Sequence, residues 1–79
     1  MSNLLPHDIE WNAGDLGCGE LVLELRRRVR AAPGQVFKII ARDPGAPADL
    51  PAWCAMTGHA LLGQDADARA YWIRAKPSY

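Results

Sequence analysis

Residues 19–42 are GELVLELRRRVRAAPGQVFKIIAR, and in this segment the pattern of apolar residues changes from helical to extended. The first half has an apolar residue at every fourth position, at Leu21, Leu25 and Val29. This spacing puts them on one face of a helix, which we expect over residues 19–32 and which Pro33 and Gly34 should end. Residues 35–42 are rich in β-branched and aromatic side chains, which favours a strand buried in part on both faces.

The sequence outside this segment contains three further strand patterns. Residues 7–12 alternate polar and apolar side chains, as in a half-buried strand. Residues 59–64 and 69–76 have a similar character, and a polar turn separates them. We therefore expect four strands.

A second, shorter helix is expected over residues 48–56. Its first turn tolerates Pro51, Asp49 is expected to cap it and Gly58 should end it. We expect Trp53 and Met56 to face the core.

The resulting order, βαβαββ, predicts an α+β fold in the form of a two-layer sandwich. The first two strands should be parallel, because the helix between them makes a right-handed crossover. A mixed four-stranded sheet with both helices on one face buries every apolar stripe. We expect one domain over residues 1–79, with residues 1–6 and 77–79 able to fray.

Composition excludes several classes of function. Nine Lys and Arg balance nine Asp and Glu, which argues against a dedicated nucleic-acid binder. Two cysteines are too few for a disulfide scaffold, and no apolar run approaches the about 20 residues of a membrane span. No signal peptide is evident at the start, so we expect a cytoplasmic protein with free thiols and no membrane contact. A core this small leaves little room for an enclosed pocket, so we expect function at the surface.

Cys18 is the candidate for chemistry, because it stands where a glycine-containing loop enters the first helix. Unpaired amides and the positive end of the helix dipole favour a thiolate there, and the thiolate is the nucleophilic form. The backbone amides of Gly19 and Glu20 could stabilise a persulfide anion, although the Glu20 carboxylate acts in the opposite direction. The alternative is that Cys18 is a small buried residue that only packs.

The segment Asp15-Leu16-Gly17-Cys18-Gly19-Glu20-Leu21 resembles the signature of the TusA/SirA-like family of sulfur-transfer proteins, in which LD-x-x-G-x-x-C-P-x-P opens the first helix. Similar features follow in the same order over nearly the whole chain, at residues 32–35, 42–44, 49–54 and 57–59. The resemblance implies a βαβαββ sandwich like the C-terminal domain of translation initiation factor 3.

The resemblance also implies a function. Cys18 would receive sulfane sulfur as a persulfide from a cysteine desulfurase or a rhodanese-like protein, and would pass it to an acceptor protein. The family serves tRNA thiolation, cofactor assembly and sulfur metabolism, so any contact with tRNA would be indirect. The transfer needs both partners and no cofactor or metal, and the chain lacks a base or pocket for independent catalysis.

Several positions depart from the family pattern. Gly19 and Leu21 replace the two prolines of C-P-x-P, and the glycine at position 19 leaves the loop looser and adds one amide donor there. Asn12 stands at the family's aspartate position, and Asp15 at its loop glycine position. The loss of both motif prolines favours a second hypothesis, a non-catalytic interaction or regulatory module on the same fold.

Other residues have simpler interpretations. Arg26, Arg27, Arg28 and Arg30 lie on the exposed side of the first helix, either as a solvated face or as a docking surface for an acidic partner or tRNA. Cys54 is interpreted as a buried structural thiol, with a redox switch through Cys18 as the alternative. His59 and Cys54 are too few ligands for a structural zinc site.

Overall fold

The computed structural model describes residues 5–77, apart from the side chain of Cys18. The six helices and strands follow the predicted order: β1 (Ile9–Gly14), α1 (Cys18–Ala31), β2 (Val36–Ala41), α2 (Ala46–Thr57), β3 (Ala60–Asp65) and β4 (Ala70–Arg74). The expectations for residues 1–4 and 78–79 lie outside the described part of the chain. Over residues 5–77, neither helix is both long and apolar enough to cross a lipid bilayer.

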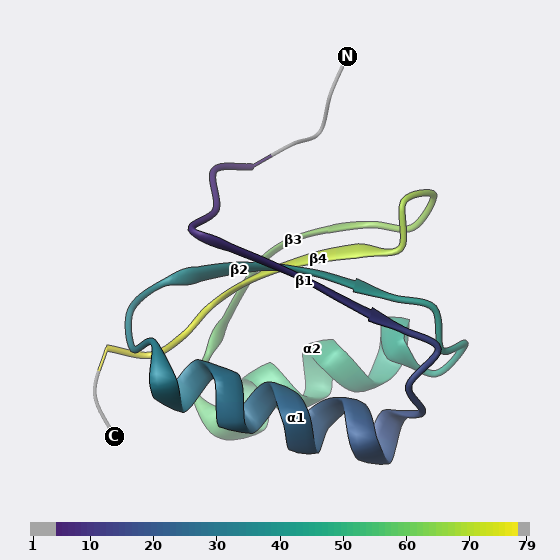
Figure 1. The fold of residues 1–79 in the computed structure, drawn as a ribbon, viewed down its shortest axis with the longest axis horizontal. Coiled ribbons are helices and arrows are strands. Elements are labelled where there is room, and N and C mark those ends of the chain that lie inside the picture. Colours follow the sequence, from purple (N-terminus) through teal and green to yellow (C-terminus); the bar gives the residue numbers. More distant parts are fainter. Residues whose placement is uncertain (1–4, 78–79) are drawn as a thin grey trace.

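The four strands form one mixed sheet in the order β1-β2-β4-β3. β1 and β2 are parallel, and β4 is antiparallel to both β2 and β3. Both helices cover the same face of this sheet, and they run in the same direction (Figure 1). The predicted two-layer α+β sandwich is therefore confirmed.

The core lies between the sheet and the helices. β2 alternates in burial, and its buried residues, Phe37, Ile39 and Ala41, belong to the same apolar cluster as α1. The predicted stripe of α1 is confirmed, because Leu21, Leu25 and Val29 are almost completely buried. This stripe fixes the rotation of α1 on the sheet, and hence the direction in which its first turn faces.

α2 begins two residues earlier than predicted, and Asp49 is not its cap. The Asp43 carboxylate accepts a hydrogen bond from the Gly45 amide at 2.8 Å, and the Asp43 carbonyl accepts one from the Ala46 amide at 3.0 Å. This turn starts the helix at Ala46, so Asp49 lies inside its first turn.

The prediction that both Trp53 and Met56 face the core is right only for Trp53. Trp53 and Cys54 are buried, whereas Met56 is 79% exposed. Met56 follows Cys54 by two residues, which is about 200° around a helix, so it points away from the sheet. The helix ends at Gly58 as expected, with a left-handed φ of 90°.

Candidate functional site

The loop before Cys18 is shaped by a side-chain turn at the end of β1. The Asn12 side-chain oxygen accepts a hydrogen bond from the Gly14 amide at 2.9 Å. Gly14 has a φ of 61°, a left-handed conformation that glycine adopts without strain. An asparagine oxygen makes this contact as an aspartate oxygen would, so the departure at Asn12 preserves the turn.

Cys18 is the first residue of α1, and Gly17 is its N-cap. The first intrahelical bond runs from the Leu21 amide to the Gly17 carbonyl, at 2.7 Å. Gly17 has no side chain that could accept a hydrogen bond from the amides of the first turn, among them those of Gly19 and Glu20. The backbone at Cys18 therefore lies at an uncapped, positive helix end, while its side chain lies outside the described part of the structure.

The structure gives different explanations for the two positions where the family pattern has proline. Gly19 is exposed, and a Cβ built on it would meet no heavy atom within 4 Å. Leu21 is 1% exposed and belongs to the core stripe of α1. The first position is therefore open to substitution, whereas the second contributes a core side chain.

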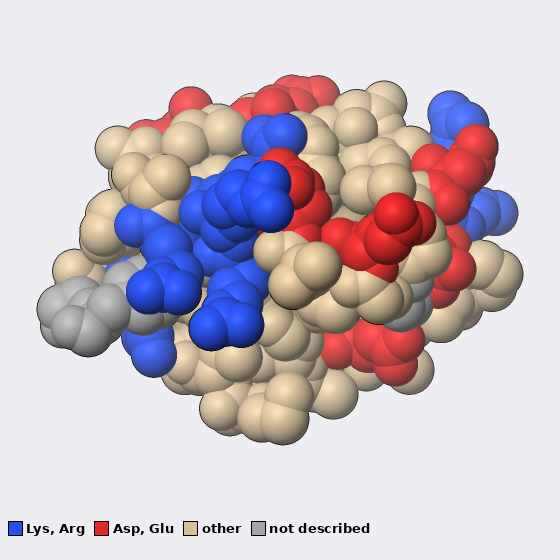
Figure 2. Space-filling model, turned by 60° about the horizontal axis from the view of Figure 1, so that its bottom comes forward, with Lys and Arg blue, Asp and Glu red and all other residues tan. Residues whose placement is uncertain are grey.

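Charge is separated along the outer face of α1. Figure 2 shows basic side chains gathered on one part of this face and acidic side chains on another. Glu20 is exposed in the first turn, whereas Arg26 and Arg30 are exposed about 12 and 18 Å further along the helix axis from Cys18. The basic surface is therefore separate from the immediate surroundings of Cys18.

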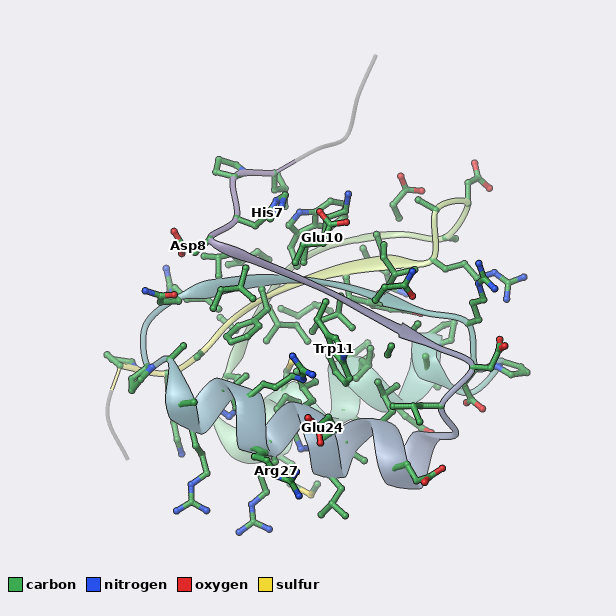
Figure 3. All side chains as sticks on the ribbon, viewed as in Figure 1. His7, Asp8, Glu10, Trp11, Glu24 and Arg27 are labelled. Carbon is green, nitrogen blue, oxygen red and sulfur yellow. The ribbon has the colours of Figure 1, made fainter. Side chains whose placement is uncertain are left out.

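A shallow groove of about 350 Å³ lies between β1 and the outer face of α1. Trp11 points from β1 toward the helix, where Glu24 and Arg27 lie (Figure 3). Arg28 is only half-buried and not part of a solvated face, because its guanidinium lies over the Trp11 ring and its Nε donates to Glu24 at 3.1 Å. Arg27 also pairs with Glu24, at 3.3 Å, but its side chain is 75% exposed.

A second groove, of about 540 Å³, lies where the two helices end, and sequence reasoning missed it. Its lining residues include Arg26, Arg30, Trp53, Met56, His59 and Lys76. It combines basic side chains with the exposed apolar side chain of Met56. Of these residues, only the arginines were interpreted from the sequence as a docking surface, because the groove forms from residues that are up to 50 positions apart.

His59 is a buried member of this groove. Its ring stacks on Trp53 with a centroid distance of 4.9 Å, and its Nδ1 accepts a hydrogen bond from the Lys76 amide at 3.0 Å. Burial lowers the pKa of His59, and the nearby positive charge of Lys76 lowers it further. His59 is therefore held in its neutral form with the proton on Nε2.

Cys54 is the buried structural thiol that the sequence predicts. It is 3% exposed, and burial raises its pKa to about 11. It lies eight residues after Ala46, about 12 Å along α2. Because α1 and α2 run in the same direction, Cys54 is near the opposite end of the helical layer from residue 18, which argues against a disulfide between the two cysteines.

Comparisons with known proteins identify the family. The family model described as "Sulfurtransferase TusA" matches residues 9–75. A "Sulfur carrier protein TusA" of Pseudomonas entomophila is 45% identical over 75 residues, covering 91% of this chain and 94% of that protein. Proteins of the same name are each 42% identical: that of Pseudomonas paraeruginosa covers 90% of this chain and 94% of its own length, and that of Pseudomonas putida strain GB-1 covers 96% and 98%. The chain belongs to the TusA family of sulfurtransferases.

Proposed function

We propose that the chain is a sulfur carrier that accepts sulfane sulfur as a persulfide on Cys18 and relays it to an acceptor protein. The observation that carries this proposal is the position of residue 18 as the first residue of a 14-residue helix whose N-cap is a glycine. The amides of the first turn and the helix dipole favour negative charge there. Family membership supports the same function.

The transfer is a balanced exchange between sulfur atoms. The Cys18 thiolate attacks the outer sulfur of a donor persulfide, forming a new S–S bond while the donor's S–S bond breaks and its thiolate leaves. The second step repeats this exchange, with the acceptor thiolate attacking the persulfide on Cys18. Sulfur moves without net oxidation, and no cofactor or metal takes part.

The environment of Cys18 acts on the anion in two directions. The amides of Gly19 and Glu20 can donate hydrogen bonds to the terminal sulfur, as in other anion sites at helix N-termini. The exposed Glu20 carboxylate disfavours a second negative charge nearby. A donor protein that brings positive charge to this end of α1 would remove that opposition.

Arg26, Arg27 and Arg30 form the docking surface in this proposal. Met56, 79% exposed, lies with Arg26 and Arg30 along the groove at the helix ends, so the surface offers an apolar contact among positive charges. This combination suits an acidic protein segment that carries an apolar side chain. The acidic groups at the other end of the face would repel an extended RNA backbone, so contact with tRNA would be indirect.

The donor type that fits is a cysteine desulfurase or a rhodanese-like protein. Candidate pathways for the acceptor are tRNA thiolation, cofactor assembly and sulfur metabolism. A reducing compartment such as the cytoplasm would keep Cys18 as a thiol that can accept sulfur.

Intact-mass measurement tests the proposal. The protein is incubated with a cysteine desulfurase and cysteine, and separately with polysulfide. We expect one adduct of about 32 Da that a reductant removes. Cys18→Ser should take up no sulfur, whereas Cys54→Ala, the matched control at the buried thiol, should load as the wild type does.

A non-catalytic interaction module on the same fold is the alternative, favoured by Gly19 at a proline position of the family pattern. It predicts no adduct with any donor. Sulfur uptake by Cys18→Ser would contradict the assignment of the transferred sulfur to Cys18.

A further inference from the structure

Arg69 has an unusual backbone conformation for its residue type. Among residues 5–77, it is the one non-glycine residue with a positive φ, at 55°. It ends the turn between β3 and β4, where glycine or asparagine would adopt this conformation at lower cost. A strained residue that persists in a fold is a reason to ask what its side chain does.

The side chain and the backbone of Arg69 both bind the end of β2. Its Nη1 donates a hydrogen bond to the Arg42 carbonyl at 3.0 Å. Its own carbonyl accepts one from the Ala41 amide, also at 3.0 Å. The turn between β3 and β4 is thus attached to the segment that leaves β2.

That segment in turn holds the loop that leads to Cys18. The Arg42 amide donates to the Gly14 carbonyl at 3.0 Å. Gly14 is the last residue of β1, and three residues separate it from Cys18. Arg42 is therefore held by Arg69 at its carbonyl and holds Gly14 through its amide.

We propose that Arg69 is a positioning residue for the Cys18 loop. By fixing the backbone of Arg42, it limits the movement of Gly14 and so of the loop that presents the first turn of α1. Only the expected effect on sulfur transfer rests on the proposed function. Arg69 acts through contacts with the backbone and is not itself catalytic.

Because Arg69 has a left-handed φ, a glycine variant can distinguish the positioning role from a general stabilising role. Arg69→Gly removes the bond to Arg42 and also relieves the backbone, so it should leave the urea midpoint of unfolding unchanged or raise it. We expect hydrogen exchange at the hydrogen-bonded amides of this attachment, those of Gly14, Leu16 and Arg42, to become about 2- to 10-fold faster, the effect of losing one hydrogen bond. The rate of sulfur loading from polysulfide should fall by a similar factor.

Two further variants complete the test. Arg69→Lys keeps the φ of 55° and one donor, so it should restore part of the exchange protection. Arg42→Ala keeps both backbone contacts of residue 42 and should behave as the wild type in exchange and loading.

Unchanged exchange at the amides of Gly14, Leu16 and Arg42 in Arg69→Gly would overturn the positioning role, as would equal acceleration at the Gly14 and Leu16 amides in Arg42→Ala. These outcomes are independent of sulfur chemistry. Failure of the wild-type protein to load sulfur would overturn the proposed function instead, and would leave the exchange result to be judged separately.

Discussion

The Arg28 guanidinium lies over the Trp11 ring, 4.4 Å from its centroid, and this contact joins α1 to the edge strand β1. The same guanidinium donates to Glu24 one helical turn earlier. α1 is thereby attached to β1 on its outer side as well as through its buried stripe. Arg28 makes this attachment from the last turn of the helix that Cys18 opens.

The first prediction concerns this contact. Arg28→Ala should lower the free energy of unfolding by about 1 kcal/mol, since a partly exposed cation–π contact contributes about 0.5–1 kcal/mol and an i,i+4 pair about 0.3–0.5. Arg27→Ala is the matched control: its partner is also Glu24, but its side chain is 75% exposed, so the loss should be under about 0.5 kcal/mol. Urea denaturation measures both, and an equal loss in the two variants would show that the ring contact adds nothing.

The second prediction isolates one amide at the helix start. The two variants to compare are Gly19→Ala and Gly19→Pro, and alanine fits because a Cβ at this position meets nothing within 4 Å. Alanine should stabilise the protein by about 0.5–1 kcal/mol and keep the amide donor. Proline is also tolerated in a first turn, but it removes that donor.

We therefore expect Gly19→Ala to hold sulfur as the wild type does, and Gly19→Pro to hold several-fold less persulfide at equilibrium with polysulfide. Intact-mass titration measures the difference. Equal occupancy in the two variants would assign the stabilisation to the Glu20 amide and the helix dipole without the Gly19 amide.

The third prediction concerns the Glu20 carboxylate, two residues after Cys18. Glu20→Gln removes a negative charge that disfavours the thiolate and keeps the backbone amide. Alkylation of the protein by iodoacetamide at pH 7 should become a few-fold faster. Cys54 should not contribute, because burial raises its pKa to about 11.

The control for Glu20 is Glu10→Gln, which removes the same charge from an exposed position on β1. It should leave the alkylation rate unchanged. A rate for Glu20→Gln no faster than that of the control would mean that solvent screens this carboxylate from the sulfur.

Particular residues show how far the sequence predicts this molecule. Leu21, Leu25 and Val29 lie in one local pattern, so the core face of α1 and the place of Cys18 at its start follow from spacing alone. α2 has no such stripe, so its rotation, and with it the exposure of Met56, depends on packing. Its start depends on the Asp43 side chain outside the helix.

The contacts that the sequence does not predict join residues that are distant along the chain. Arg69 and Arg42 are 27 positions apart, and His59 and Lys76 are 17 apart. These pairs meet only because β4 lies beside both β2 and β3. Periodicity describes one element at a time, so it predicted neither the groove at the helix ends nor the attachment of the Cys18 loop.

The fourth prediction tests the basic docking surface. Arg26→Glu should weaken binding to a cysteine desulfurase that loads the wild-type protein, and the loss should shrink as salt is raised. Arg74→Glu is the control, because Arg74 is also an exposed arginine but lies on β4 and not on the outer face of α1. Surface plasmon resonance at two salt concentrations measures the affinity of both variants. Equal losses of affinity would show that binding depends on the net charge of the protein and not on the basic surface of α1.

The fifth prediction is a dependence of stability on pH that originates at His59. Its folded-state pKa lies below 6.5, so above that value the ring is neutral in both the folded and the unfolded states. As the pH falls below about 6.5, the unfolded state binds a proton that the folded state resists, and the free energy of unfolding decreases. Once the pH is below the folded-state pKa, protonation also prevents Nδ1 from accepting the Lys76 amide.

The urea midpoint should therefore be lower at pH 5.5 than at pH 7.5, beyond the change in a His59→Gln variant, which has no proton to bind. His7→Gln is the matched control, because it replaces the other histidine of the chain, which is exposed near its start. A pH dependence that is unchanged in His59→Gln would assign the effect to other groups and remove His59 as its origin.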